Sequence, residues 1–412
     1  MSNMHAFTAL SWRWSAILMG AISVSSAWAS DEELPLFLSL SQSMTRDSNL
    51  LRDDANRKQD YISITSLSGG INKAYGRQNY RLTAEASHHD YKHNSQYNND
   101  GYALSGSADS ELGSDFKLSV SGASSRFLPN FENQTDRSVR NIQTNKQYVA
   151  DLRYGLYGRW STNATVSRTE TRYNFATWDN KTSVVRAVGL RFMPSDLVYF
   201  GTSLSRSDTD VPNRVLVGVA AVGEKIERTS LGFNTYWVVT GFSRLSGSLA
   251  VTNENHPADK RRNFKGVTGS AAWNYTPGGK MSYALTWVRN TSNEGGQTLG
   301  QNINADSVFS TNNRLTNTFT GSARWQATAK VGVNAAYTHA LYQEDYGVGT
   351  AVALTNSSVN GRYNGLSLGV SYQPIRSVDL GCDAQRYDRT RSTFSRAYSG
   401  NALTCRASFT ID

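Results

Sequence analysis

The chain has 412 residues, a net charge of +9 and a mean hydropathy of −0.48, values that taken alone resemble those of a soluble protein. Its 21 Tyr, 9 Trp and 33 Gly against only 7 Pro nevertheless favour β structure. After residue 29 there is no run of about 18 apolar residues, which excludes a transmembrane helix from that part of the sequence. A membrane β-barrel is compatible with the low hydropathy, because only every second residue of each strand faces lipid.

Residues 1–29 have the pattern of a secretory signal peptide. Arg13 precedes a short apolar segment over residues 15–27, and Ala27-Trp-Ala29 is a small-x-small cleavage site. The segment is too short to span a membrane as an anchor. We therefore expect cleavage after Ala29, with residues 30–412 forming one β-barrel domain.

Strict alternation of apolar and polar residues organises the mature chain, most clearly over its last stretch from Leu403 to Ile411. A terminal strand of this kind fits a closed barrel, in which the last strand pairs with the first and removes both edges. Similar runs occur throughout, at residues 36–46, 60–74, 80–87, 102–111, 116–125, 148–156, 160–172, 183–192, 198–207, 226–239, 242–253, 263–275, 281–292, 314–326, 329–342, 362–373, 377–387 and 403–411.

These runs predict an all-β fold, a transmembrane antiparallel up-and-down β-barrel of about 18 strands, with 16 as the alternative. Short joints alternate with long polar connections, which places the two kinds on opposite rims and both termini on the periplasmic side. Aromatic residues next to the short joints, among them Trp273, Trp325 and Tyr372, fit an interfacial girdle. A soluble β-sandwich or solenoid is the alternative, but it would not need rings recurring at strand ends.

The same alternation assigns the two faces of each predicted strand. In the run from Arg314, for example, Leu315, Phe319 and Trp325 face lipid, although Asn317 breaks the pattern. The opposite parity gives candidate lumen-lining residues, namely Arg314, Thr316, Thr318, Thr320, Arg324, Lys330, Asn334, Tyr342, Asp379, Asp383 and Arg406. A barrel of this size encloses water unless something plugs it.

Two apolar segments, residues 215–223 and 347–354, fall where outer loops are expected. Each fits either a constriction folded into the lumen or a strand extension above the membrane.

Cys382 and Cys405 have outward parity on strands predicted to be neighbours. Either they form a disulfide in the oxidising periplasm, or two thiols pack against lipid.

Residues for catalysis or metal binding are sparse. Asp208 and Asp210, in an expected loop after Arg206, offer oxygen ligands for calcium, but two carboxylates alone equally fit a solvated loop. No Cys/His spacing matches a zinc site, and His339 has lipid-facing parity. No nucleophile and base are brought together on the wall. We expect no enzyme activity, no cofactor, no metal and no nucleic-acid partner.

Five short stretches occur in a recognisable order, namely Thr45-Arg-Asp-Ser-Asn-Leu-Leu-Arg52, Arg140–Asn145, Val211–Arg214, Leu380–Cys382 and Thr404–Phe409. In these stretches the chain resembles the EpsL-type outer-membrane proteins of exopolysaccharide biosynthesis operons, a branch of a broader β-barrel porin family. It departs from many outer-membrane proteins in ending on Asp412 instead of an aromatic residue. The resemblance implies a bacterial outer-membrane barrel, with lipid, lipopolysaccharide, the polysaccharide and a periplasmic export or co-polymerase protein as partners.

The main hypothesis is therefore a channel that takes part in exopolysaccharide export, with a polar lumen that passes or guides the polymer. A general diffusion porin for small solutes is the first alternative, and a barrel-embedded lipid or glycan hydrolase is the second. Hydroxyls, amides and rings suit a sliding carbohydrate, but any porin lumen is polar because water fills it. The excess positive charge fits an acidic polymer and lipopolysaccharide phosphates equally well.

Overall fold

The computed structural model describes residues 36–133, 136–214, 223–257, 260, 263–292, 309–350, 353–390 and 397–411. The predicted signal peptide and the apolar segment 215–222 lie outside these residues. In chain order the strands are β1 (Leu36–Asp47), β2 (Asp60–Tyr75), β3 (Gln78–Tyr91), β4 (Asn99–Leu112), β5 (Phe116–Phe127), β6 (Gln143–Tyr154), β7 (Trp160–Tyr173), β8 (Lys181–Ser195), β9 (Val198–Val211), β10 (Glu224–Thr240), β11 (Ser243–Asn255), β12 (Phe264–Tyr275), β13 (Met281–Ser292), β14 (Phe309–Gln326), β15 (Val331–Thr350), β16 (Ala353–Ile375), β17 (Val378–Arg389) and β18 (Tyr398–Ile411). The described connections include short 3₁₀ helices, namely η1 (Ser95–Tyr97), η2 (Phe131–Asn133) and η3 (Thr177–Asp179).

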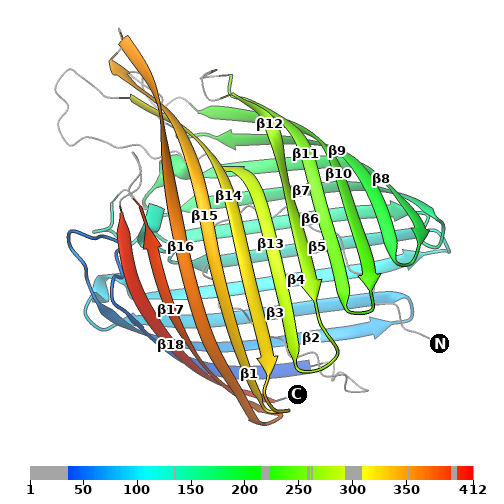
Figure 1. Cartoon of the computed structure of the whole chain (residues 1–412), viewed down its shortest axis with the longest axis horizontal. Coiled ribbons are helices and arrows are strands. Elements are labelled where there is room, and N and C mark those ends of the chain that lie inside the picture. The colour runs from blue at the N-terminus through cyan, green and yellow to red at the C-terminus, as the bar shows by residue number, and fades with distance from the viewer. Residues whose placement is uncertain are drawn as a thin grey trace. The chain divides into compact units, whose positions relative to one another are not determined.

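All described strands belong to one 18-stranded antiparallel sheet that closes on itself (Figure 1). Each strand pairs with its neighbours in the chain, and β1 pairs with both β2 and β18. The closing ladder runs from the Leu38–Ile411 pair to the Asp47–Ala402 pair. The predicted all-β transmembrane barrel is therefore confirmed, with 18 strands and not 16. Closure leaves no unpaired edge between the first and last strands, as a lipid-exposed sheet requires.

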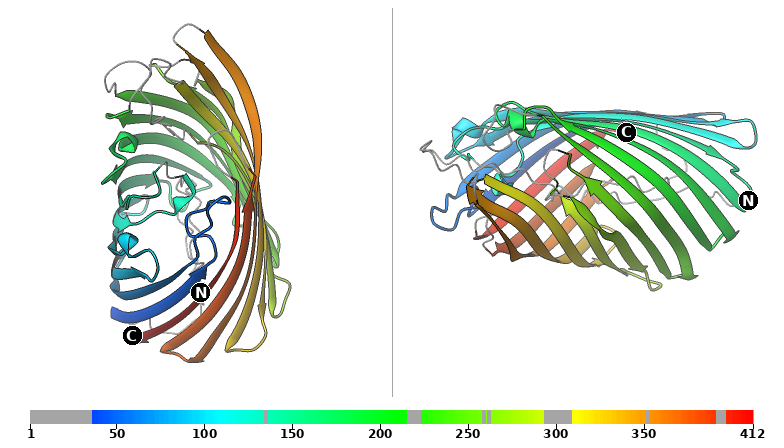
Figure 2. Two further views of the ribbon diagram at one scale, coloured as in Figure 1. Left: turned by 90° about the vertical axis from the view of Figure 1, so that its left-hand side faces the viewer. Right: turned by 90° about the horizontal axis from the view of Figure 1, so that it is seen from above.

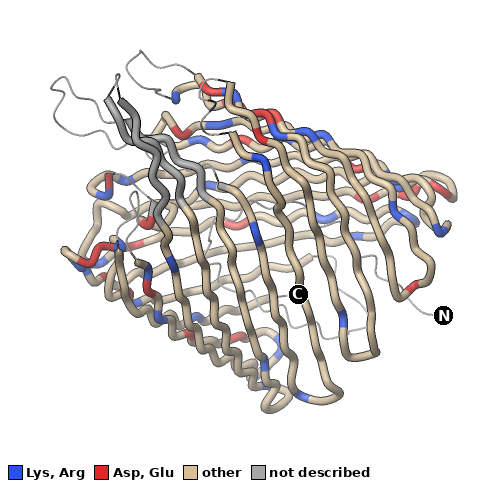
Figure 3. The backbone as a smooth tube through the Cα atoms, turned by 45° about the horizontal axis from the view of Figure 1, so that its top comes forward, with Lys and Arg blue, Asp and Glu red and all other residues tan. Residues whose placement is uncertain are grey.

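Large apolar side chains cover the outer face of the barrel. In β18, Leu403, Phe409 and Ile411 are 50%, 48% and 58% exposed, values that would be costly in water but are favourable against acyl chains. Charged residues are few along the middle of the front strands (Figure 3). The predicted girdle residues Trp325 and Tyr372 are likewise exposed. Among the described residues, no helix is long and apolar enough to cross a membrane. The chain is thus an integral β-barrel of the outer-membrane type.

Short turns lie at one rim of the barrel, and most long connections lie at the other. Gly76 and Gly113 have positive φ values of 60° and 67° in two of the short turns, a conformation that glycine adopts without steric cost. Leu36 and Ile411, the first and last described strand residues, are both at the short-turn rim, which is the periplasmic rim in barrels of this kind.

Several strands are longer than their alternation predicts. β14, β15 and β16 have 18, 20 and 23 residues, whereas about 9–11 suffice to cross a bilayer. Most of the apolar segment 347–354 accordingly belongs to β15 and β16, as a strand extension, and residues 351–352 lie outside the described part. β9 also continues to Val211, so the expected loop at Asp208 and Asp210 was wrong. Backbone pairing needs no apolar side chains, and strands therefore continue beyond the lipid-facing alternation.

The two cysteines are directly opposite each other on β17 and β18 and are joined by a disulfide. They lie on the outward face, in the parity series of Leu380 and Leu403. The bond closes a segment with a sequence separation of 23 residues.

Replacing Cys405 by Ser is expected to lower the free energy of unfolding by about 3 kcal/mol, because a crosslink over a segment of this length restricts the unfolded chain. Urea titration of the folded protein in lipid vesicles measures the change. A reductant should lower the midpoint of the wild type and leave that of the variant unaltered. Equal midpoints for the two proteins without reductant would contradict the expectation.

Candidate functional site in the barrel lumen

The inner face of the barrel carries hydroxyl, amide and charged side chains. The register places Thr316, Thr318, Thr320, Arg324, Asn334, Asp379, Asp383 and Arg406 on this face. Thr320 and Thr338 lie side by side on β14 and β15, with their hydroxyl oxygens 3.4 Å apart. Arg406 Nη2 lies 3.5 Å from Asp379 Oδ1, so these opposite charges partly balance each other.

Three of the expected lumen-lining residues differ from the expectation or are not described. Lys330 lies in the short β14–β15 turn, and its Nζ donates to the Pro374 carbonyl oxygen at 2.6 Å, which ties two turns together at the rim. Tyr342 is only 2% exposed because Tyr363, Tyr387 and neighbouring residues pack around it. Parity identifies the face of a residue, but it does not reveal whether other side chains cover it. The side chain of Arg314 lies outside the described part of the structure.

The connection from β1 to β2 is anchored by a buried polar network. Arg52 has a positive φ of 56°, a conformation that costs a non-glycine residue energy unless its surroundings hold it. Its Nη1 donates to Asp47 Oδ2 at 2.8 Å, and its guanidinium lies 4.1 Å from the ring centroid of Tyr387. The Tyr387 hydroxyl donates to Asp47 Oδ1 at 2.6 Å. Viewed from the left-hand side of Figure 1, this blue connection is drawn within the ring of strands (Figure 2, left).

The connection from β5 to β6 reaches the same region. Glu132 Oε1 lies 2.6 Å from Arg389 Nη1, although β5 and β17 are six places apart around the sheet. Beside this ion pair, Leu50, Tyr91, Tyr97 and Phe131 form an apolar cluster. Burial raises the pKa of Tyr97, so its hydroxyl remains protonated and donates to the Arg137 carbonyl oxygen. Together the contacts of Asp47, Arg52, Glu132, Tyr387 and Arg389 form an outer-mouth cluster that anchors two connections at the long-connection rim.

A second buried network lies across β9 to β13. His256 Nδ1 lies 2.7 Å from Glu224 Oε1, and Nε2 lies 3.0 Å from Glu254 Oε1. Arg214 Nη1 lies 3.2 Å from Glu224 Oε2, while Arg228 Nε donates to Glu254 Oε2 at 2.6 Å. Both ring nitrogens of His256 thus lie within hydrogen-bond distance of a glutamate oxygen. We call these five residues the histidine network.

The histidine network lies next to the shortest backbone ladder among the described strand pairs. β12 and β13 pair from Tyr275–Tyr283 only as far as Gly269–Arg289, although each continues to pair with its other neighbour. Beyond that point Arg289 Nε donates to the Val267 carbonyl oxygen at 3.1 Å. Arg228 Nη2 also donates to Thr291 Oγ1 at 2.9 Å, which connects β10 with β13. Side chains thus replace the missing ladder at this seam.

The sequence did not predict either network. His256 stands in no recognisable motif, and the connection after β5 is rich in polar residues although its Phe131 is 3% exposed. The only available signal was the Asp47-to-Arg52 motif, whose residues do form an anchor. Asp208, considered for calcium, lies on β9 with its carboxylate oxygens 2.8 Å from Arg186 and 3.2 Å from Arg206, which uses them in ion pairs. Among the described residues, no group of three or more His, Cys, Asp or Glu is arranged to hold a metal.

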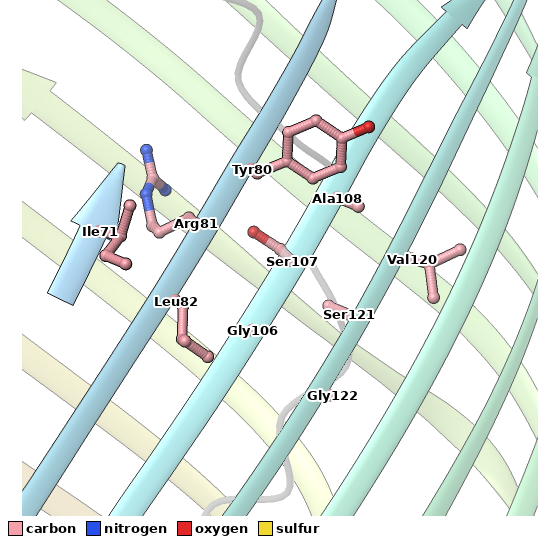
Figure 4. A pocket seen from close by; sticks show the side chains of 10 residues that line it. All are labelled: Ile71, Tyr80, Arg81, Leu82, Gly106, Ser107, Ala108, Val120, Ser121 and Gly122. Atoms are coloured by element: carbon pink, nitrogen blue, oxygen red, sulfur yellow. The ribbon is translucent and has the colours of Figure 1, made fainter. Parts of the chain in front are cut away.

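A hollow in the barrel wall lies over β2 to β5 (Figure 4). Gly106, Ala108 and Gly122 leave space there between Leu82 and Val120, which are exposed on the outer face. Because most of its lining has lipid-facing parity, the hollow suits acyl chains and not a polar solute. The lumen is therefore the better candidate for function.

No protein-family model matches the chain, and no curated protein matches its sequence. Among solved structures, OccK5 (OpdH) of Pseudomonas aeruginosa aligns over 92% of this chain and 98% of its own, with 13% identity and a TM-score of 0.47. The outer membrane protein OpdK of the same organism aligns over 91% and 98%, with 10% identity and a TM-score of 0.48. The siderophore receptor PirA of Pseudomonas aeruginosa aligns over 93% and 81%, with 10% identity and a TM-score of 0.43. Similarity this low does not indicate what the present chain transports.

Proposed function

We propose that the protein is a general diffusion channel for small polar solutes across the outer membrane, and not an enzyme. The observation that carries the proposal is the polar inner face of a closed 18-stranded sheet, lined by residues such as Thr318, Thr320 and Asn334. A barrel of this strand number has room for water inside, and hydroxyl and amide groups replace part of the hydration of a passing solute.

The outer-mouth cluster favours a channel for small solutes over a wide channel for a polymer. The Glu132–Arg389 pair and the Asp47–Arg52–Tyr387 contacts hold two connections toward the interior at one rim. Buried ion pairs of this kind are held in place by strong local contacts, so the two connections keep their place at the mouth. Connections fixed there favour solutes of limited size over a polymer.

Planar-bilayer recording and vesicle swelling test this proposal. The purified protein is expected to conduct KCl and to admit sugars up to a sharp size limit, with swelling rates that fall steeply from monosaccharide to tetrasaccharide. The heat-unfolded protein serves as the control. Absence of KCl conductance from correctly folded protein would refute the proposal.

Exopolysaccharide export is the second candidate, and the resemblance over Thr45–Arg52 favours it. Because these residues form the anchored β1–β2 connection, the motif has a structural role at the mouth through which a polymer would leave. On this alternative, the mouth opens when a periplasmic export protein delivers the chain.

Deleting the gene and measuring cell-surface polysaccharide separates the two candidates. Loss of surface polymer, restored by the wild-type gene, supports export. Unchanged polymer together with slower uptake of small solutes supports the diffusion channel and removes export.

A further inference from the structure

A row of basic and aromatic side chains occupies the inner face near the short-turn rim. Arg191 of β8, Tyr199 of β9 and Tyr236 of β10 lie on neighbouring strands, with Arg153 of β6 and Arg244 of β11 at either side. Their parity is opposite to that of the exposed lipid-facing Tyr154, Phe200 and Trp237. All five side chains are therefore presented to the lumen.

The three central side chains form a stack. The guanidinium carbon of Arg191 lies 4.0 Å from the ring centroid of Tyr199. The rings of Tyr199 and Tyr236 have centroids 5.8 Å apart and an interplanar angle of 16°. A guanidinium held over a ring face keeps its outer N–H groups in a fixed plane, so little side-chain entropy is lost when they bind a ligand.

The positive charge of this row is not balanced by neighbouring carboxylates. Arg153, Arg191 and Arg244 have no ion-pair partner within 4.0 Å among the described residues, and the Nε of Arg191 is buried without a hydrogen-bond partner. Asp151, on the same face of β6 two residues before Arg153, accepts from Thr165 Oγ1 at 2.5 Å and keeps its negative charge, but it forms no ion pair with this row. The three guanidinium groups therefore carry more charge than Asp151 offsets, and an excess of positive charge on a polar wall attracts anions.

We propose that Arg153, Arg191 and Arg244, with the Tyr199–Tyr236 stack, form a binding site for cyclic solutes that carry a carboxylate, such as sugar acids. The guanidinium of Arg191 donates two N–H hydrogen bonds to the carboxylate, and the tyrosine faces contact the ring of the solute. Arg153 and Arg244 attract the anion toward the stack from both sides. The site rests on the proposed channel function and names the class of solute that the channel selects.

The test uses the purified full-length protein with glucuronate and glucose as probes, since the two differ in the carboxylate. Block of KCl current in planar bilayers and isothermal calorimetry of the folded protein in detergent give two independent readouts. Glucuronate is expected to block at a concentration at least about tenfold lower than glucose, since one charge-assisted contact supplies an increment of that size.

Arg191→Gln should raise the half-blocking concentration of glucuronate about tenfold and leave that of glucose unaltered. Arg191→Lys keeps the charge but loses the planar guanidinium. Its half-blocking concentration of glucuronate should lie between those of the wild type and Arg191→Gln. Arg81→Gln is the matched control, because Arg81 faces the lumen from the distant β3 and its loss changes the lumen charge equally. Intact KCl conductance of each variant establishes that it has folded.

A pore that conducts KCl but does not distinguish glucuronate from glucose would overturn the site and leave the channel proposal standing. An effect of Arg81→Gln equal to that of Arg191→Gln would also overturn the site, because it would assign the preference to overall lumen charge. Absence of conductance would refute the channel, and calorimetry would still decide the site. An oligo-uronate that binds more tightly per carboxylate than the monomer would identify a polymer as the source of the ligand.

Discussion

Replacing Glu254 by Gln is expected to lower the free energy of unfolding by about 3–5 kcal/mol, which is the usual cost of removing one partner from a buried ion pair. Glu254 is 1% exposed and accepts from Arg228, which is 8% exposed, at 2.6 Å. An amide cannot neutralise Arg228, and its NH₂ group would face donors of Arg228 or His256. The buried guanidinium of Arg228 would then lose the carboxylate of Glu254.

The effect should be concentrated at the seam between β12 and β13. Arg228 also donates to Thr291 on β13, so its displacement removes one of the side-chain contacts that bridge the end of the ladder. Hydrogen exchange of residues 264–268 and 290–292 is expected to accelerate in the variant before that of other strands. Urea titration in lipid vesicles measures the global change.

Glu227→Gln is the matched control for this prediction, because it makes the same chemical change on β10, where Glu227 pairs with Arg206 at 3.1 Å. Both side chains of that pair are about half exposed, at 46% and 57%. Exposed pairs contribute about 0–1 kcal/mol, so the control should unfold almost as the wild type does. Equal stabilities of the two variants would mean that the histidine network does not hold the wall together.

Replacing Glu132 by Gln is expected to widen the outer mouth and raise the single-channel conductance. The side chain of Arg389 is fully buried, its guanidinium lies 4.8 Å from the ring centroid of Tyr342, and its Nη1 lies 2.6 Å from Glu132 Oε1. Loss of a buried pair costs about 3–5 kcal/mol, and each 1.4 kcal/mol is about tenfold in an equilibrium constant. The balance between docked and undocked β5–β6 connection should therefore shift by more than about a hundredfold.

Asp136→Asn provides the control. Asp136 lies in the same connection but is exposed, and its Oδ1 accepts from the backbone N–H and the hydroxyl of Ser138. It removes the same charge and should leave the conductance unaltered. A conductance of Glu132→Gln no higher than that of the wild type would argue against a restriction of the mouth by this connection.

Alternation along the chain was sufficient to predict the strands and their faces. Leu403, Phe409 and Ile411 were expected to face lipid and are exposed on the outer wall. The bilayer acts on every second residue of each strand, so this signal is local and repeats in every strand. The ends of strands were harder to predict, as β9 and β16 illustrate, because pairing continues where no lipid imposes a pattern.

The sequence by itself determined an antiparallel barrel with a lipid-facing exterior and a polar interior. The stack of Arg191, Tyr199 and Tyr236 depends on the register of three strands, which the sequence does not give. The tertiary structure decided how much of the interior is filled. Glu132 and Arg389 are 257 residues apart in the chain, and His256 meets Glu224 from 32 residues away. Such contacts have no periodicity, because they arise only when closure of the sheet brings distant segments into one lumen.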